Sequence, residues 1–129
     1  MRFMMIVKAN KSYEAGEPPN PALMAAVAKL GEEQMRNGTL LMTGGLAPSS
    51  RSARIYLSGG TLDVKDGPFS ETKELVGGFA IMQAESLTEA IEHGRRFMSL
   101  HREVMGPSYE GQLEIRPLVG PDDPCGQPG

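Results

Sequence analysis

The segment from Phe3 to Val7 is apolar at every position, and this run constrains the fold more than any other stretch of the chain. Neighbouring side chains of a strand point to opposite faces of a sheet, so a strand of this kind needs both of its faces covered. The run is too short to span a membrane or to serve as a signal peptide. We therefore predict a first strand that is apolar on both faces, in a cytoplasmic protein.

Signals for helices and turns follow this strand in a definite order. Asn20-Pro21 is typical of a helix start and Asn37-Gly38 of a helix stop, while Ser86 to Glu89 forms a capping box that begins a second helix. Gly59-Gly60 predicts the turn of a hairpin. Further strands are expected at 39–43, 53–57, 62–65, 76–83 and 113–117, and a loop at 8–20.

Two finer expectations concern packing. The second helix is predicted to turn one apolar face inward, because apolar or small residues recur at helical spacing at Leu87, Ile91, Gly94 and Met98. Gly77-Gly78, near the start of the strand at 76–83, predicts a bulge or a close approach of two backbones.

The order of elements is strand, helix, strand, hairpin, strand, helix, strand. Two strand–helix–strand units around a hairpin predict an α+β fold, a ferredoxin-like sandwich with an inserted β-hairpin. Two helices can cover only one face of the sheet, although the first strand is apolar on both. The simplest cover for the second face is another copy of the chain, so we predict a face-to-face homodimer.

Length and composition exclude several classes of function. The 129 residues suit one domain, which we place at 1–118, followed by a loose Pro- and Gly-rich tail at 119–129. A net charge of −3 and 5% aromatic residues argue against a nucleic-acid partner. The single cysteine, Cys125, and the two histidines, His93 and His101, argue against disulfides and a zinc site. We expect no metal, no cofactor and no membrane partner.

The strongest functional signal is Asp66-Gly67-Pro68-Phe69, followed by Glu71 and Lys73. Gly and Pro predict a tight turn that aims Asp66 away from the preceding strand, and we expect a positive φ at Gly67. Asp66 is a candidate general acid or base if a cleft desolvates it; alternatively it only stabilises the turn. Lys73 is a candidate to orient an anionic substrate together with Glu71, and the alternative is a solvated ion pair.

Three other positions are possible functional sites by residue type. Arg116 lies on the polar side of the last strand and is a candidate anchor for an anion; the alternative is a salt bridge with Glu114. His101 is interpreted as a half-buried histidine or a cation near a helix end. Gly44-Gly45 lacks the spacing of a dinucleotide-binding loop, so no nucleotide site is predicted.

Several segments together resemble the YCII-related domain proteins, in the branch named for its Asp-Gly-Pro-Phe (DGPF) signature. The similarity spans roughly residues 1 to 118 and is carried by segments 2–7, 44–48, 66–74, 77–79, 89–92 and 114–117. The resemblance implies a ferredoxin-like fold that forms a dimeric α/β barrel. It also implies a small-molecule enzyme or binding protein, in which related members use a His–Asp pair. No histidine of this chain matches that pair.

Three hypotheses follow. The first is a cytoplasmic homodimer with an inter-sheet cleft for a small molecule; if it is an enzyme, Asp66 would transfer protons on an anionic or carbonyl substrate. Glu71, Lys73 and Arg116 would then bind that substrate. The second is a ligand-binding or regulatory module without catalysis. The third is a purely structural role for the DGPF motif, fixing a turn that shapes the dimer.

Overall fold

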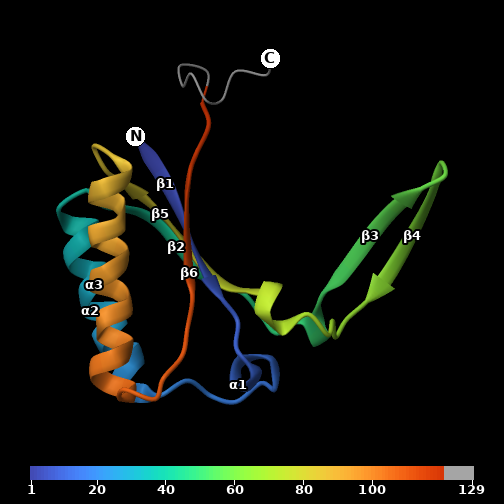
Figure 1. The fold of residues 1–129 in the computed structure, drawn as a ribbon, viewed down its shortest axis with the longest axis horizontal. Helices are drawn as coiled ribbons and strands as arrows, with labels where there is room; N and C mark the ends of the chain where they lie inside the picture. The colour runs from blue at the N-terminus through green and yellow to red at the C-terminus, as the bar shows by residue number, and fades with distance from the viewer. Residues whose placement is uncertain (121–129) are drawn as a thin grey trace.

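The computed structural model describes residues 1–120, which form one antiparallel sheet, two long helices and a separate hairpin (Figure 1). The strands are β1 (Arg2–Lys8), β2 (Leu40–Gly45), β3 (Ala53–Ser58), β4 (Thr61–Asp66), β5 (Val76–Gln83) and β6 (Leu113–Pro117). The helices are α1 (Lys11–Glu14), α2 (Pro21–Arg36) and α3 (Leu87–Met105), with 3-10 turns η1 (Ser49–Arg51) and η2 (Thr72–Glu74). The tail predicted at 119–129, with Cys125, lies almost entirely outside the described residues.

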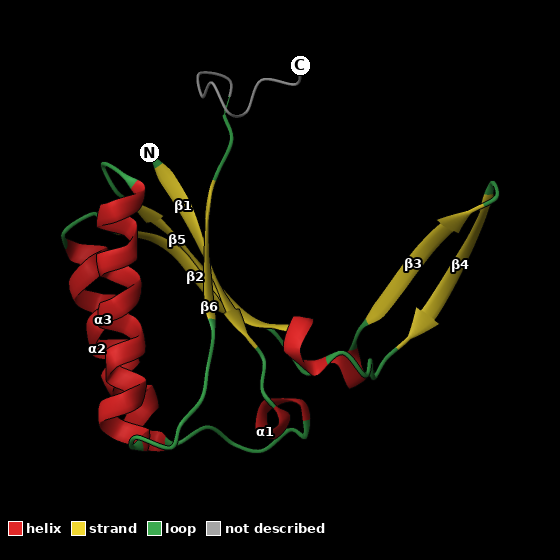
Figure 2. Ribbon diagram, viewed as in Figure 1, coloured by secondary structure: helices red, strands yellow, loops and turns green. Residues whose placement is uncertain are grey.

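The main sheet has the strand order β2-β5-β1-β6, and every neighbouring pair is antiparallel. With α2 after β1 and α3 after β5, this is the ferredoxin-like arrangement that the sequence predicted. Figure 2 shows α2 and α3 side by side on one face of the sheet, while β3 and β4 form an arm on the far side. Four strands in one chain leave an open sheet, not a closed barrel.

The helix ends follow the predicted signals. Asn20 Oδ1 accepts hydrogen bonds from the amides of Ala22 at 2.8 Å and Leu23 at 3.2 Å, which caps the start of α2. At the start of α3, Ser86 Oγ accepts from the amide of Glu89 at 3.2 Å. Helix α3 is capped at its C-terminal end by Gly106, whose φ of +93° favours glycine.

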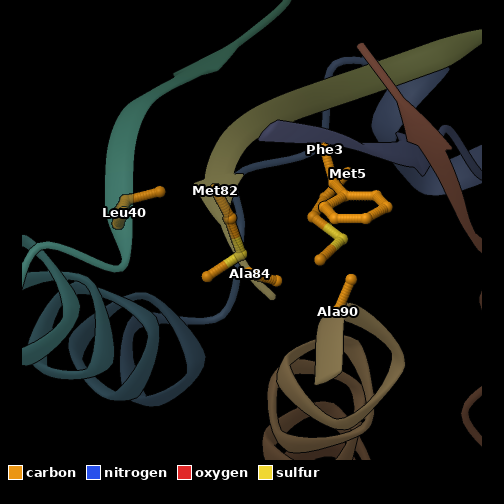
Figure 3. Packing of buried hydrophobic residues seen from close by; sticks show 6 residues of the cluster. All are labelled: Phe3, Met5, Leu40, Met82, Ala84 and Ala90. Atoms are coloured by element: carbon orange, nitrogen blue, oxygen red, sulfur yellow. The ribbon is translucent and has the colours of Figure 1, made fainter. Parts of the chain in front are cut away.

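The hydrophobic core lies between the sheet and the first turns of α3 (Figure 3). Phe3 of β1 and Ala90 of α3 are completely buried and belong to the same cluster. Alternate residues of β1 point to the helices, with Met5 beside Phe3 in the same cluster. The fully buried cluster is small, comprising Phe3, Met5, Leu40, Met82, Ala84 and Ala90.

Two local predictions are wrong. The stretch 8–20 contains a short helix, α1, because Asn10 caps it by accepting a hydrogen bond from the amide of Tyr13 at 2.8 Å. The inner face of α3 is rotated from the predicted one: Gly94 is buried as predicted, but Leu87 and Ile91 are exposed, and Ala90 is buried in their place. Because α3 packs on Phe3 at this position, a small side chain such as that of Ala90 is favoured there.

The hairpin turn and the bulge are as predicted. Gly59 and Gly60 have φ values of +57° and +77°, which only glycine adopts at low cost and which suit a two-residue hairpin turn. The pairing of β1 with β5 shifts where Val7 faces Gly78 but Lys8 faces Val76, so Gly77 is the bulged residue. Within a single chain, both faces of the hairpin lie in solvent.

The face of the sheet opposite the helices has no cover among the described residues (Figure 2). Strand alternation places Met4, Ile6, Phe79 and Ile81 on it, at the centre of the sheet. We call these four residues and their surroundings the open sheet face. No helix in the described part of the chain is long and apolar enough to cross a membrane.

Candidate functional site

The DGPF turn is tied to the rest of the protein through one buried residue, Ser49. Its hydroxyl accepts a hydrogen bond from the amide of Phe69 at 3.0 Å and donates to a carboxylate oxygen of Glu14. The other carboxylate oxygen of Glu14 accepts from the amide of Ser49 at 2.8 Å. Three segments far apart in the sequence, α1, η1 and the turn after β4, are therefore joined by one polar network at the base of the arm.

Neither Glu14 nor Ser49 was predicted from the sequence. Thirty-five residues separate them, and neither belongs to a local pattern. Ser49 is only 5% exposed, and a buried hydroxyl needs hydrogen-bond partners, so its burial is the signal that the network matters.

Gly67 is required by a close approach of two backbones. A Cβ atom at this position would lie 1.7 Å from the carbonyl oxygen of Ser49, while the amide of Gly67 donates to the carbonyl of Ser52 at 2.9 Å. The peptide bond from Gly67 to Pro68 is cis. Gly67 does not have a positive φ, so the predicted reason for this glycine is wrong, and the steric reason replaces it.

Arg54 holds the segment that follows the turn. Its guanidinium lies 3.7 Å from the centre of the Phe69 ring, and its Nη1 lies 3.5 Å from Oε2 of Glu71. The phenol of Tyr56 and then the carboxylate of Glu71 raise the pKa of Arg54, so it stays a cation. Glu71 is thus engaged in an exposed ion pair on the hairpin base.

Asp66 is the last residue of β4 and pairs with Ala53 in the hairpin, with an exposed side chain. The prediction that the turn aims it away from its strand is wrong, because the turn begins only after it. Lys73 lies in η2, and its side chain is outside what the structure describes. The roles proposed for Asp66 in catalysis and for Glu71 and Lys73 in substrate binding stay predictions.

Arg116 lies on β6, opposite Met4, and so belongs to the open sheet face. Its Nε is 3.6 Å from Oε2 of Glu114, whose other oxygen is 3.5 Å from Nζ of Lys8. This short row of charges borders the apolar centre of the open sheet face. Asp66 and Arg116 belong to different sheets, and in the described part of the chain no ion pair or hydrogen bond joins them. The role of Arg116 in substrate binding stays a prediction.

A large cavity lies on the other side of the sheet, between the helices, the sheet and the segment around α1. Its volume is about 1290 Å³, which is larger than the roughly 300–1,000 Å³ that is usual for small-molecule sites. Apolar side chains make most of its wall, including Val27 and Leu30 of α2, Phe97 and Met105 of α3, and Leu113 of β6. The cavity begins where the small buried core ends. The layer between the two helices and the sheet is therefore filled by the core at one end and holds the cavity at the other.

Two glycines form the sheet floor of this cavity. Gly45 of β2 faces Gly78 of β5, and alternation from Val7 places both on the side of the helices. A Cβ atom at Gly45 would meet only the hydroxyl of Tyr13, at 4.0 Å. The missing side chain of Gly45 therefore opens this end of the cavity, whereas a Cβ atom at Gly78 would lie 3.2 Å from the carbonyl oxygen of Gly44.

His101 gives the cavity a polar group of defined character. It is 7% exposed and lies between two aromatic rings, with its ring centre 4.7 Å from that of Phe97 and 5.5 Å from that of Tyr109. Its Nδ1 is 3.0 Å from the carbonyl oxygen of Phe97. A carbonyl can only accept, so Nδ1 carries the proton and Nε2 of the neutral ring is an acceptor. The sequence predicted a half-buried histidine, and His101 is buried more deeply than that.

His93 lines the same cavity one turn before Phe97. Its Nε2 is buried without a hydrogen-bond partner among the described residues, and Oε1 of Glu89 lies 3.6 Å away. The helical spacing that puts His93, Phe97 and His101 on one face of α3 was visible in the sequence. Residues 1–120 contain no group of three or more His, Cys, Asp or Glu side chains placed to hold a metal ion.

Comparison with known proteins identifies the family. The family model of the YCII-related domain matches residues 1–97, which is most of the chain. The chain belongs to the YCII-related domain family. A relative in Rhizobium meliloti (strain 1021) is an uncharacterised protein that is 38% identical over 74 residues. That match covers 57% of this chain and 55% of the relative, so the chain matches about half the length of that protein.

The YCII-related match covers β1 through the first part of α3, including the turn with Asp66-Gly67-Pro68-Phe69. The ferredoxin-like α+β arrangement and the family membership predicted from the sequence are therefore confirmed. The family description names no substrate, and assignment to the DGPF branch stays a prediction.

Proposed function

We propose that this YCII-related protein binds a small, mainly apolar molecule in the cavity between α2, α3 and the sheet. The observation that carries the proposal is the cavity floor, where Gly45 presents no side chain and a Cβ atom would meet only the hydroxyl of Tyr13, at 4.0 Å. A pocket of apolar walls with a few placed polar groups is the usual form of such a site.

The hydrogen-bonding state of the His101 ring limits which chemical groups of a ligand it can bind. With Nδ1 donating to Phe97, the free Nε2 accepts a hydrogen bond, so the matching ligand group is a donor such as a phenol, enol or alcohol. The rings of Phe97 and Tyr109 on either side favour a flat, unsaturated body next to that group. p-Cresol has both features and is a suitable first probe.

Filling the floor of the cavity should abolish binding. In Gly45→Leu the new side chain enters open space, so the fold should keep its melting temperature while the ligand loses its place. Ligand-observed NMR with p-cresol measures this, and we expect saturable binding by the wild type at about 1 mM or tighter. Loss of at least tenfold in affinity is expected for the variant.

Gly120→Leu is the matched control, because a Cβ atom there meets nothing within 4 Å and lies outside the cavity. It should bind p-cresol as the wild type does. Equal affinity of Gly45→Leu and the wild type would place the ligand elsewhere and refute the proposed site.

We also infer that the protein is a homodimer that buries its open sheet face. The support is the row of apolar residues Met4, Ile6, Phe79 and Ile81, which no helix within residues 1–120 covers. A dimer that pairs these faces would form the barrel and the inter-sheet cleft that the family resemblance implies.

Proton transfer on an anionic or carbonyl substrate is the alternative function. It needs Asp66 in a site that excludes water, because a general base near neutral pH depends on desolvation or a charged neighbour. In one chain the Asp66 side chain is exposed at the end of β4. Ligand binding without catalysis therefore has the stronger support from the geometry.

A further inference from the structure

One face of the hairpin arm is apolar and has no cover. Ile55 pairs directly with Val64, and Leu57 with Leu62, so the four side chains share one face. They are 69%, 66%, 72% and 67% exposed in that order. We call these four residues the apolar arm face. A two-stranded hairpin alone in water is marginally stable, so this arm needs a surface to pack on.

The arm is held in a fixed direction away from its own sheet. Figure 1 shows β3 and β4 extending from the end of the molecule opposite the helices. The network of Glu14, Ser49 and Phe69 fixes the base from which it extends. An arm pinned in this way cannot fold back on the rest of its chain, so the surface that it meets belongs to another molecule.

The same chain carries a second uncovered apolar surface, the open sheet face. Its border is mainly basic: alternation puts Arg2 and Lys8 at the two ends of β1 on this face, and Arg116 lies beside them. The apolar arm face ends in an acid, because Asp66 follows Leu62 and Val64 on the same side of β4. The two surfaces are thus complementary in both polarity and charge.

We propose that, in this two-fold dimer, the apolar arm face of each copy packs against the basic border of the other copy's open sheet face, beside the paired sheets. The contact is reciprocal, so both exposed apolar surfaces of each chain are buried at once. Asp66 of one copy then meets the basic border of the other copy, near Arg116. Residues that a single chain keeps on separate sheets are joined, and the site predicted around Asp66 is complete only in the dimer.

This proposal rests on the homodimer inferred above. Light scattering on a variant of the arm tests the arm contact separately from the existence of the dimer. The test variant is Leu57→Thr with Leu62→Thr, since threonine favours strands and keeps the hairpin while removing apolar contact. We expect its dimer dissociation constant to rise at least a hundredfold. Tyr56→Thr, on the opposite face of β3, is the control and should leave the dimer unchanged.

A second measurement locates the contact directly. A spin label at Ser58→Cys, in a Cys125→Ser background, is mixed with unlabelled ¹⁵N-enriched protein, so that broadened amides report the partner only. Broadening at Ile6, Phe79 and Ile81 is expected. A wild type that is monomeric refutes both the homodimer and the arm contact; a dimer that survives the double change, or is broadened only elsewhere, refutes the arm contact alone.

Discussion

Gly67→Ala should destabilise the protein more than any other single methyl group added to the chain. The new Cβ atom would lie 1.7 Å from the carbonyl oxygen of Ser49, a distance that no rotamer change relieves, because both partners are backbone or Cβ. The turn must move away from η1 and give up the hydrogen bonds that Ser49 makes. We expect a loss of about 4 kcal/mol or more in the free energy of unfolding.

Gly60→Ala is the control for this effect. Gly60 has a φ of +77° but open space around it, so only conformational strain opposes the alanine. The expected loss is about 1 kcal/mol. Urea denaturation of both variants makes the comparison, and similar losses would show that the approach of Gly67 to Ser49 is not a tight one.

Ser49→Ala should have the second largest effect. It leaves the buried amide of Phe69 without an acceptor and removes one of the two donors that the Glu14 carboxylate has from Ser49. Unpaired buried groups cost about 1–3 kcal/mol each, so we expect a loss of about 2–3 kcal/mol. The matched control is Ser50→Ala, whose side chain is exposed and which should change stability by less than about 0.5 kcal/mol.

The Ser49 experiment also tests the structural role of the DGPF motif. If the network fixes the base of the arm, Ser49→Ala should weaken the dimer as well as the fold. Amide hydrogen exchange measures the arm separately from the sheet. In Ser49→Ala we expect the exchange rates of β3 and β4 to rise above their wild-type values by more than those of β1 do. Unchanged protection of the arm would contradict the view that Glu14 and Ser49 hold it.

The sequence predicted those features that depend on neighbouring residues. Asn20, Ser86 and the Gly59-Gly60 pair act through local backbone geometry, so the helix starts and the hairpin turn could be predicted from them. The family resemblance drew attention to the turn at Asp66-Gly67-Pro68-Phe69, and its role in function stays a prediction. The small helix α1 was missed because its cap, Asn10, stands in a stretch whose Gly and Pro content indicates a loop.

The features that the sequence did not predict depend on residues far apart in the chain. The reason for Gly67 is a contact with Ser49, and Ser49 in turn needs Glu14. The cavity arises where Gly45 meets Gly78 across two strands, although each glycine alone indicates only a strand end or a bulge. Such pairings depend on register and packing, which local patterns do not contain.

The central claim is that the cavity between the helices and the sheet binds a small molecule, and one NMR titration tests it most directly. Adding p-cresol to ¹⁵N-enriched protein should shift the amides of Gly45, Gly78, His101 and Tyr109 together along one saturable curve. These residues come from four separate segments, and all of them line the cavity. Shifts confined to the open sheet face or the arm, or no saturable shift, would contradict the claim.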